Sequence, residues 1–416
     1  MSAAGGTPSP SGAAFEGYLP GSPEYRRITV SLFLAGVVTF ALLYSTQPIL
    51  PLLSEEFGLD AGTAALSVSV ATAGLGLALL VAGPMSEVRG RTPLMHASLF
   101  AASSIALAGA LAPGWNVLLA LRLVEGVVLA GLPAVAMAYL AEEVHPSATA
   151  RAAGLYIGGT AIGGMSGRLV TGAIAEVTGW RTALLGIGLV SLACAVAVRV
   201  LLPRSRGFTP APASAAHLLA AARVILRDPA FLCLFGIGGT AMGAFVGVFN
   251  ATSYRLMTPP YGYSVGVVGL VFLTYAVGSV SSTYAGRAAA RFGQRTVAPV
   301  CALITLVGLL GTWFTPILLV AVALTVMTGG FFALHGVASG WVAARAERGS
   351  AAKGQASSGY LFTYYAGSSV FGAMAGHAWE SGGWNSVVLL CAGLFGLAFL
   401  LTLVLRRIPA LPHPSP

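Results

Sequence analysis

Two charged residues, Arg122 and Glu125, stand in an otherwise apolar stretch of the chain, residues 118–140 (LLALRLVEGVVLAGLPAVAMAYL). A spacing of three residues places both side chains on one face of a helix. A charge near the centre of a bilayer costs about 2.5–3.5 kcal/mol on insertion scales, so we expect both to face a bundle interior or a wet cavity. A carboxylate there can carry a proton across the membrane, and an Arg–Glu pair can instead fix helix packing. Both interpretations stay open.

Arg168 is a further arginine inside an apolar stretch, and we expect it at a depth similar to that of Arg122. Two guanidinium groups beside one carboxylate would keep Glu125 ionised, which makes it a poor proton carrier unless a movement separates the charges. A net positive cluster would attract an anionic substrate instead. Proton coupling and anion binding therefore remain alternatives for these three residues.

Other polar candidates stand in other apolar stretches: Tyr44, Gln47, Asn250, His335 and Tyr364. A histidine titrates near neutral pH, but a lone histidine in a helix is more often a hydrogen-bonded core residue. Tyr364 suits an aromatic wall for an amphipathic ligand and equally suits packing. The sequence contains no nucleophile–base set, no metal-spaced cluster and no phosphate-binding loop. We therefore expect no enzyme, no cofactor and no metal site.

The elements that must position these residues are membrane helices. The chain has 416 residues, of which 56% are hydrophobic and only 8% are charged, whereas a soluble domain is about 25% charged. A helix needs about 20 apolar residues to cross the hydrocarbon core. Such runs recur at 28–50, 62–85, 93–111, 116–140, 150–175, 181–202, 230–253, 264–286, 296–315, 317–343, 356–378 and 384–405. The sequence therefore predicts an all-α integral membrane protein with twelve transmembrane helices.

The placement of the basic residues predicts the orientation. The net charge is +9, but it does not indicate nucleic acid, because the basic residues gather at alternate loops and at both tails. All but four of the 22 Lys and Arg residues lie on one predicted side; the four are Arg122, Arg168, Arg181 and Arg255. The positive-inside rule makes that side cytoplasmic. We expect a multi-pass protein of the inner (plasma) membrane with both termini in the cytoplasm.

The chain repeats itself at a nearly constant shift. Residues 83–92 (GPMSEVRGRT) match 286–295 (GRAAARFGQR), and 179–181 (GWR) matches 383–385 (GWN), at shifts of 203 and 204 residues. Duplicated halves around a central pathway are typical of transporters. We predict a disordered tail over 1–27, six-helix bundles over 28–202 and 229–407, a cytoplasmic linker over 203–228, and a tail over 408–416.

The repeated segment resembles the cytoplasmic signature of the major facilitator superfamily, a glycine followed by an acidic residue, a glycine and basic residues. The matching residues are Gly83, Glu87, Arg89, Gly90 and Arg91. The second-half copy has Gly286, Arg291, Gly293 and Arg295. The copies depart from the pattern at Val88, where a basic residue is usual, and at Ala290, which replaces the acid. The resemblance implies a gate at the cytoplasmic ends of the helices.

Two further motifs narrow the resemblance. Arg122 with Gly126 is similar to the fourth-helix motif of proton-driven members. The fifth-helix motif of exporters is similar to Gly159, Gly163, Gly164 and Gly167, with Gly164 where proline is usual. Residues 44–48 (YSTQP), 163–168 (GGMSGR) and 179–181 (GWR) resemble the YnfM-like branch of inner-membrane exporters.

The resemblance implies a secondary active transporter that exports a small organic molecule by alternating access, coupled to protons. The alternative is a carrier or exchanger of a small anionic metabolite, with Arg122 and Arg168 as its anion site. A third hypothesis, from another class, is a non-transporting membrane sensor. The expected partners are membrane lipid, a small-molecule substrate and protons, and we expect a monomer.

Overall fold

The computed structural model describes residues 15–208, 215–348 and 353–409. Within these ranges the named elements are all helices, α1 to α15 and two 3₁₀-helices, η1 and η2. Nine helical spans in this part of the chain are long and apolar enough to cross a membrane. The prediction of an all-α integral membrane protein is confirmed.

The first group of helices runs from α1 to α8. Its elements are α1 (Pro23–Leu43), η1 (Gln47–Ile49), α2 (Leu50–Phe57), α3 (Ala61–Arg89), α4 (Arg91–Ala110), α5 (Trp115–Leu129), α6 (Ala136–Glu143), α7 (Pro146–Thr178) and α8 (Trp180–Leu201). A short helix, α9 (Ala215–Arg227), follows in the segment expected to be a linker.

The second group runs from α10 to α15. Its elements are α10 (Pro229–Met257), α11 (Val265–Gly269), η2 (Leu270–Tyr275), α12 (Ala276–Phe292), α13 (Gln294–Gly311), α14 (Ile317–Arg348) and α15 (Lys353–Arg407). The α15 helix bends at Gly382 and Gly383, so it contains two of the expected spans. The nine apolar spans therefore include ten of the twelve expected ones. The α5–α6 pair and α7 correspond to the other two.

Proline interrupts two spans that the hydropathy pattern marks as single helices. The ring of Pro48 removes a backbone donor and clashes with the preceding turn, so α1 ends at Leu43 and η1 starts only at Gln47. Pro133 lies in the turn that separates α5 from α6. Each break frees backbone groups inside a span, and tighter local turns, neighbouring side chains or ordered water must satisfy them there.

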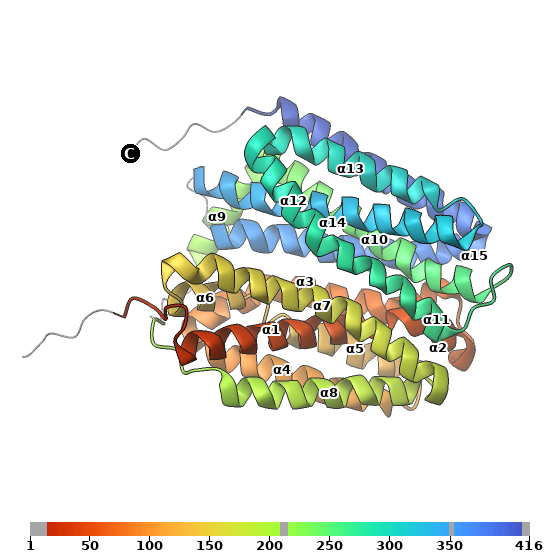
Figure 1. The fold of residues 1–416 in the computed structure, drawn as a ribbon, viewed down its shortest axis with the longest axis horizontal. Coiled ribbons are helices and arrows are strands. Elements are labelled where there is room, and N and C mark those ends of the chain that lie inside the picture. Colours follow the sequence, from red (N-terminus) through yellow and green to blue (C-terminus); the bar gives the residue numbers. More distant parts are fainter. Residues whose placement is uncertain (1–14, 209–214, 349–352, 410–416) are drawn as a thin grey trace, which may run out of the picture.

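The two groups lie side by side, the first below and the second above in Figure 1. The α3 helix packs along α15, and α7 packs along α11 and η2, so these pairs form the interface between the groups. Both described chain ends lie at the left in Figure 1, whereas α2 and α11 lie at the right. We call these the terminus end and the distal end.

The expected tails differ from the structure where it describes them. Residues 1–14 and 410–416 lie outside the described residues. Residues 23–27 are the first five residues of α1. Ser22 caps this helix, because its hydroxyl accepts a hydrogen bond from the Tyr25 N–H at 3.2 Å. Tyr18 bonds to the backbone of Glu143 and His145. The composition of residues 1–27 gives no sign of these local contacts.

Candidate functional site

Arg122 on α5 holds the broken end of α1. Its Nε donates to the carbonyl of Ser67 on α3 at 3.0 Å. Its two Nη atoms donate to the carbonyls of Leu42 and Leu43 at 3.0 and 2.5 Å. The last carbonyls of a helix lack their usual partners and interact favourably with a cation. The arginine therefore stabilises the interruption that Pro48 imposes on the first span.

Glu125 is the counter-charge of Arg122. One carboxylate oxygen, Oε2, accepts from Nη1 of Arg122 at 2.7 Å, and the two side chains are 2% and 3% exposed. The other oxygen, Oε1, has no hydrogen-bond partner among the described residues. Through Arg122 the pair is connected to α1 and α3, and Oε1 of Glu125 is an oxygen to which a proton can add, so the geometry is compatible with either interpretation.

Arg168 on α7 occupies a different environment. It is 1% exposed, and no carboxylate in the described residues pairs with it. Its Nε donates to Oε1 of Gln47 at 2.6 Å. Its guanidinium carbon lies 4.2 Å from the ring centroid of Tyr44, 4.7 Å from that of Tyr275 and 5.1 Å from that of Phe272. Aromatic faces attract a cation without cancelling its charge, so Arg168 is an uncompensated buried cation.

The two arginines do not share Glu125, contrary to the expected cluster. Arg122 binds the last carbonyls of α1, and Arg168 binds the first side chain of η1. The three-residue break between Leu43 and Gln47 separates the two contacts. A movement of this break would therefore affect both arginines.

Gln47 and Asn250 connect Arg168 to the second group. Nε2 of Gln47 donates to Oδ1 of Asn250 on α10 at 2.7 Å, and Nδ2 of Asn250 donates to the Gly372 carbonyl of α15 at 3.2 Å. Both amides are buried, at 0% and 1% exposure. This series of hydrogen bonds crosses the interface between the groups, and it brings together two of the residues singled out by the sequence.

Aromatic side chains extend from Arg168 into the second group. The ring of Tyr275 lies 5.4 Å from that of Phe245, which stacks on Phe331 at 3.9 Å. Phe331 in turn lies 6.4 Å from Tyr364. The surroundings of the cation are therefore apolar and aromatic on the side of the second group.

His335 on α14 lies beyond this aromatic series and does not contact Arg168. Its Nδ1 is 2.9 Å from the hydroxyl of Tyr360, and its ring lies 4.6 Å from that of Tyr364. This geometry corresponds to a hydrogen-bonded histidine packed among aromatic rings.

The distal end is closed by contacts between the two groups. The Ser54 and Tyr254 hydroxyls are 2.7 Å apart, and Oε2 of Glu176 on α7 accepts from the Gly266 N–H on α11 at 2.9 Å. Where α15 crosses α3, a Cβ added at Gly376 would overlap the backbone of α3. Backbones this close leave no passage at the distal end between these helices.

Charged side chains at the start of α3 add to this closure. Oε1 of Glu380 accepts from the Ala61 N–H at 2.9 Å, and Nδ1 of His377 lies 3.7 Å from Oδ1 of Asp60. Asp60 also caps α3 by accepting from the Thr63 N–H at 2.7 Å. That backbone hydrogen bond holds the pKa of Asp60 below its ordinary value.

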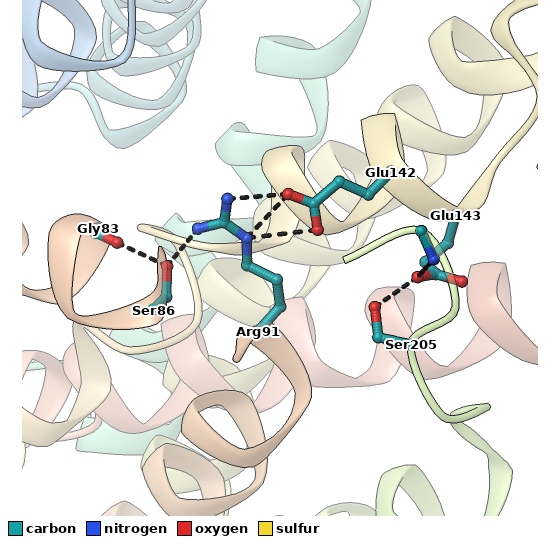
Figure 2. A network of polar contacts seen from close by, with 7 residues as sticks. Gly83, Ser86, Arg91, Glu142, Glu143 and Ser205 are labelled. Atoms are coloured by element: carbon teal, nitrogen blue, oxygen red, sulfur yellow. Dashed lines mark hydrogen bonds and ion pairs between the residues drawn. The ribbon is translucent and has the colours of Figure 1, made fainter. Parts of the chain in front are cut away.

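Among the described residues, the motif of residues 83–92 contacts the first group and Phe208 in the segment after α8, whose ring lies 5.6 Å from the Arg91 guanidinium. Arg91 donates from Nε and Nη2 to Oε1 of Glu142 at 3.0 and 2.8 Å, and from Nη1 to Oγ of Ser86 at 2.5 Å (Figure 2). Ser86 in turn donates to the Gly83 carbonyl at 2.6 Å. Gly90 has φ +94°, a conformation that favours glycine, and separates α3 from α4.

The remaining charges of this motif make no bridge to the second group. Glu87 has no ion-pair partner in the described ranges, and Arg89 contacts only the sulfur of Met85, at 3.5 Å. In the second-half copy, Gly293 repeats the positive φ, at +84°. Arg295 donates to the carbonyls of Arg406 and Ile408, and Arg291 lies over the ring of Phe292. Among the residues that the structure describes, this motif therefore makes no ion pair or side-chain hydrogen bond to the second group at the terminus end.

The helix-five glycines form a packing surface. A Cβ at Gly159, Gly163 or Gly167 would overlap α1 at Phe33, Val37 or Ala41, respectively. Small residues four apart allow membrane helices to approach this closely. Gly164 faces another direction, and its carbonyl accepts from Nη1 of Arg168.

Several residues of the site escaped the sequence analysis. The sequence does not distinguish Phe272, Tyr275 and Phe245 from the other apolar residues of the spans. Nothing in their spacing relates them to Arg168. Glu142 and Glu143 are not among the predicted site residues, although an acidic pair at the end of an apolar span is a visible signal. Oε1 of Glu143 accepts from the backbone N–H groups of Arg206 and Gly207 at 2.7 and 2.8 Å. It also accepts from the hydroxyl of Ser205 (Figure 2).

Comparison with known proteins gives consistent matches. The model of the Major Facilitator Superfamily matches residues 32–258 and 240–416. The chain is 43% identical to the inner membrane transport protein YnfM of Escherichia coli (strain K12), over 93% of the chain and 92% of that protein. It is 40% identical to the uncharacterized MFS-type transporter YybF of Bacillus subtilis (strain 168), over 94% of the chain and 96% of that protein.

Solved structures share the fold. A bacterial homolog of the human lysosomal transporter Spinster, in an inward-facing and unoccupied conformation, aligns with a TM-score of 0.75 at 16% identity, over 94% of the chain and 100% of that structure. The nucleoside transporter NupG aligns with a TM-score of 0.70 at 13% identity, over 91% and 99%.

Proposed function

The chain belongs to the major facilitator superfamily, and from this premise we propose that it carries a small organic anion by alternating access, coupled to protons. That it is a multi-pass membrane transporter and not an enzyme follows from the family and from its relatives. The substrate class, the coupling ion and the direction are parts of the proposal.

The observation that carries the proposal is the uncompensated charge of Arg168. Burying an unpaired ion is expensive, and a side chain that keeps its charge there usually has a partner. Arg168 has three aromatic faces, the amide of Gln47 and the carbonyl of Gly164 around it, all of them uncharged. A carboxylate on a substrate would supply the missing counter-charge, and Arg binds carboxylates through two parallel N–H groups. The aromatic side chains of the second group suit an apolar or aromatic body on the same substrate.

Glu125 is the proposed coupling group. Protonation of its carboxylate would weaken its hold on Arg122, which binds the last carbonyls of α1. The next residues of that break contact Arg168 through Tyr44 and Gln47. A change at Glu125 therefore has a short physical route to the anion site, through backbone that is already non-helical.

The contacts between the groups support an alternating-access cycle. The distal end is closed by Glu176, Ser54 and Glu380 with their partners. In the described part of the chain, the motif of residues 83–92 makes no ion pair or side-chain hydrogen bond to the second group. With both termini in the cytoplasm, as the basic residues predict, this conformation would face inward. Export from the inner membrane is the direction that the helix-five resemblance implies.

The test is transport in proteoliposomes with an imposed pH gradient. Small aromatic carboxylates are compared with the matching amides, and an internal pH dye reports proton movement. We expect the carboxylates, but not the amides, to drive a proton flux in the wild type. We expect Arg168→Gln to abolish carboxylate transport, and Glu125→Gln to leave exchange of carboxylate while removing its accumulation by the gradient.

Arg181→Gln serves as the matched control, because Arg181 is a half-exposed distal arginine paired with Glu56 at 3.4 Å. It should transport as the wild type does. Equal transport of the carboxylate and its amide, or full transport by Arg168→Gln, would sink the anion assignment. The sign of the gradient that drives accumulation gives the direction.

A further inference from the structure

A cavity of about 710 Å³ lies among α12, α13 and α14, away from the Arg168 site. It runs along α14 from Gly336 to Arg348, which corresponds to about 18 Å at 1.5 Å per residue. The second-half copy of the repeated motif forms its other wall, through Gly286, Gly293 and Arg295. The cavity therefore lies at the terminus end of the second group.

The outer part of the cavity is basic. Arg295, Arg345 and Arg348 line it, and no acidic residue in the described ranges does. Asp228 pairs with Arg345 at 2.7 Å and so offsets one of the three charges. Arg295 donates only to backbone carbonyls, which leave its charge in place. Glu347 is the other nearby acid, and it is exposed on α14 outside the lining.

The inner part of the cavity is lined by apolar residues, two of which are glycines. One to three turns deeper than the arginines, α14 contributes Gly336, Val337, Gly340 and Trp341. A Cβ at Gly340 would meet no atom within 4 Å. Phe292, 60% exposed, lines the cavity at its rim. A ligand that fills this shape has an anionic head and an apolar body.

In the first half, the corresponding place is filled by residues of the first group and of the segment that follows α8. There Arg91 pairs with Glu142, and the ring of Phe208 lies 5.6 Å from the Arg91 guanidinium. At the shift of 203 residues, Arg345 stands where the first half has Glu142, and Ala290 stands where it has Glu87. At that shift the first-half bases Arg89 and Arg91 correspond to Phe292 and Gln294, so neither the acids nor the bases are repeated in place. The described residues that line the second groove include three arginines and no acid, and Asp228 offsets the charge of Arg345 alone.

We propose that this cavity binds the phosphate group of an anionic membrane phospholipid, with Arg295 and Arg348 on the phosphate and an acyl chain toward Gly336. Basic pockets between membrane helices at the cytoplasmic side recognise lipid head groups in this manner. The site is independent of the proposed transport substrate, because it shares no residue with the surroundings of Arg168.

The experiment titrates the full-length protein in detergent with phosphatidylglycerol, phosphatidylcholine or inorganic phosphate, and measures bound lipid by native mass spectrometry. We expect phosphatidylglycerol to bind at least about tenfold more tightly than phosphatidylcholine. In R295Q/R348Q we expect affinity for phosphatidylglycerol to fall about 30-fold, since each arginine near an anionic head group contributes a factor of about five.

Two further variants separate the cavity from general charge. G340L fills the cavity without removing a charge and should lower the affinity for phosphatidylglycerol at least about tenfold. This variant tests the site even if R295Q/R348Q does not fold. R26Q/R27Q removes two exposed arginines from the start of α1 and should change affinity less than about twofold.

Three results would overturn the proposal. The first is an equal loss in R26Q/R27Q and R295Q/R348Q, which would mean that the net charge alone attracts lipid. The second is unchanged binding in G340L. The third is complete displacement of the lipid by millimolar inorganic phosphate, which would assign the arginines to a soluble anion.

Discussion

Arg122 and Arg168 illustrate two different ways to bury an arginine. Arg122 makes four hydrogen bonds, three to carbonyls and one to Glu125, so its charge is both paired and solvated by backbone. Arg168 has an amide, one carbonyl and three aromatic faces instead. The first arrangement stabilises the fold of the first group, and the second leaves a charge available to a ligand.

Removing Arg122 should damage the fold more than removing the pair. Arg122→Met leaves Glu125 buried without its partner, and breaking such a pair costs about 3–5 kcal/mol. The double variant R122M/E125L replaces the pair by apolar side chains and should recover most of that loss. Thermal unfolding in detergent measures both. A double variant as unstable as Arg122→Met would show that the three carbonyl contacts, not the charge, dominate.

Arg168→Lys tests whether the guanidinium shape matters. Lysine keeps the positive charge but lacks the planar pair of N–H groups that binds a carboxylate. We expect affinity for an aromatic carboxylate to fall at least about tenfold, with the thermal stability of the protein without ligand little changed. Calorimetric titration gives the affinity. Equal affinities of wild type and Arg168→Lys would reduce the role of Arg168 to a general positive potential.

Small residues determine how the helices of the first group approach one another. Gly159, Gly163 and Gly167 form a stripe on α7 that contacts α1 directly below the break. This stripe holds α1 on one side and Arg122 holds its end on another, so the position of the break at residues 44–46 depends on both contacts.

Gly163→Ala should destabilise the protein by about 1–3 kcal/mol, because the added Cβ overlaps the Val37 carbonyl. Gly158→Ala on the same helix is the control, since a Cβ there meets nothing within 4 Å. It should be neutral or stabilising by up to about 1 kcal/mol. Thermal unfolding of both variants measures this difference in stability. Equal stabilities would mean that α1 and α7 can separate without cost.

Asp60 should make the stability of α3 depend on pH. Its pKa is lowered in the folded protein, chiefly by the Thr63 N–H. The stabilisation from its charge is therefore present above the unfolded pKa of about 3.9 and is lost as pH falls through the folded pKa. Asp60→Ala should cost about 1 kcal/mol at pH 7, as for other lost helix caps.

The comparison of unfolding temperatures at pH 7 and pH 3 checks this sign. The difference between the wild type and Asp60→Ala should shrink at the lower pH, and Asp60→Asn, which keeps an uncharged cap, should show the smaller loss. A difference that grows toward pH 3 would contradict the assignment.

The whole molecule has two groups of helices joined firmly at the distal end. Contacts there include hydrogen bonds between Glu176 and Gly266 and between Glu380 and Ala61. A transporter that works by alternating access must break these contacts once per cycle. In the proposed cycle, distal opening is the step that breaks these contacts, and the binding of substrate and proton would drive it.

A disulfide at the distal end should stop transport reversibly. A Cβ at Gly266 would lie 3.2 Å from Cβ of Glu176, close to the separation in a disulfide. In a background without the native cysteines, the oxidised pair Glu176→Cys/Gly266→Cys should be inactive and should regain transport with a reductant. The single variant Gly266→Cys is the control. Transport that continues while the pair is oxidised would argue against distal opening.

The sequence predicts the fold well, because runs of apolar residues are long and the repeat at Gly83 and Gly286 marks the two halves. It also predicts that Arg122 and Glu125 meet, since they lie one helical turn apart. It does not predict the surroundings of Arg168, because Phe272 and Tyr275 are distant in sequence and reach it only when the two groups pack. Pairing across an interface depends on tertiary geometry that no local pattern encodes.

The central claim is that Glu125 and the anion site at Arg168 are coupled, and the affinity for an aromatic carboxylate as a function of pH tests it most directly. Linkage requires that if anion binding changes the protonation of Glu125, pH changes the anion affinity. We expect a pH-dependent Kd in the wild type and a pH-independent Kd in Glu125→Gln. We also expect no measurable binding in Arg168→Gln. A pH dependence that persists unchanged in Glu125→Gln would contradict this coupling.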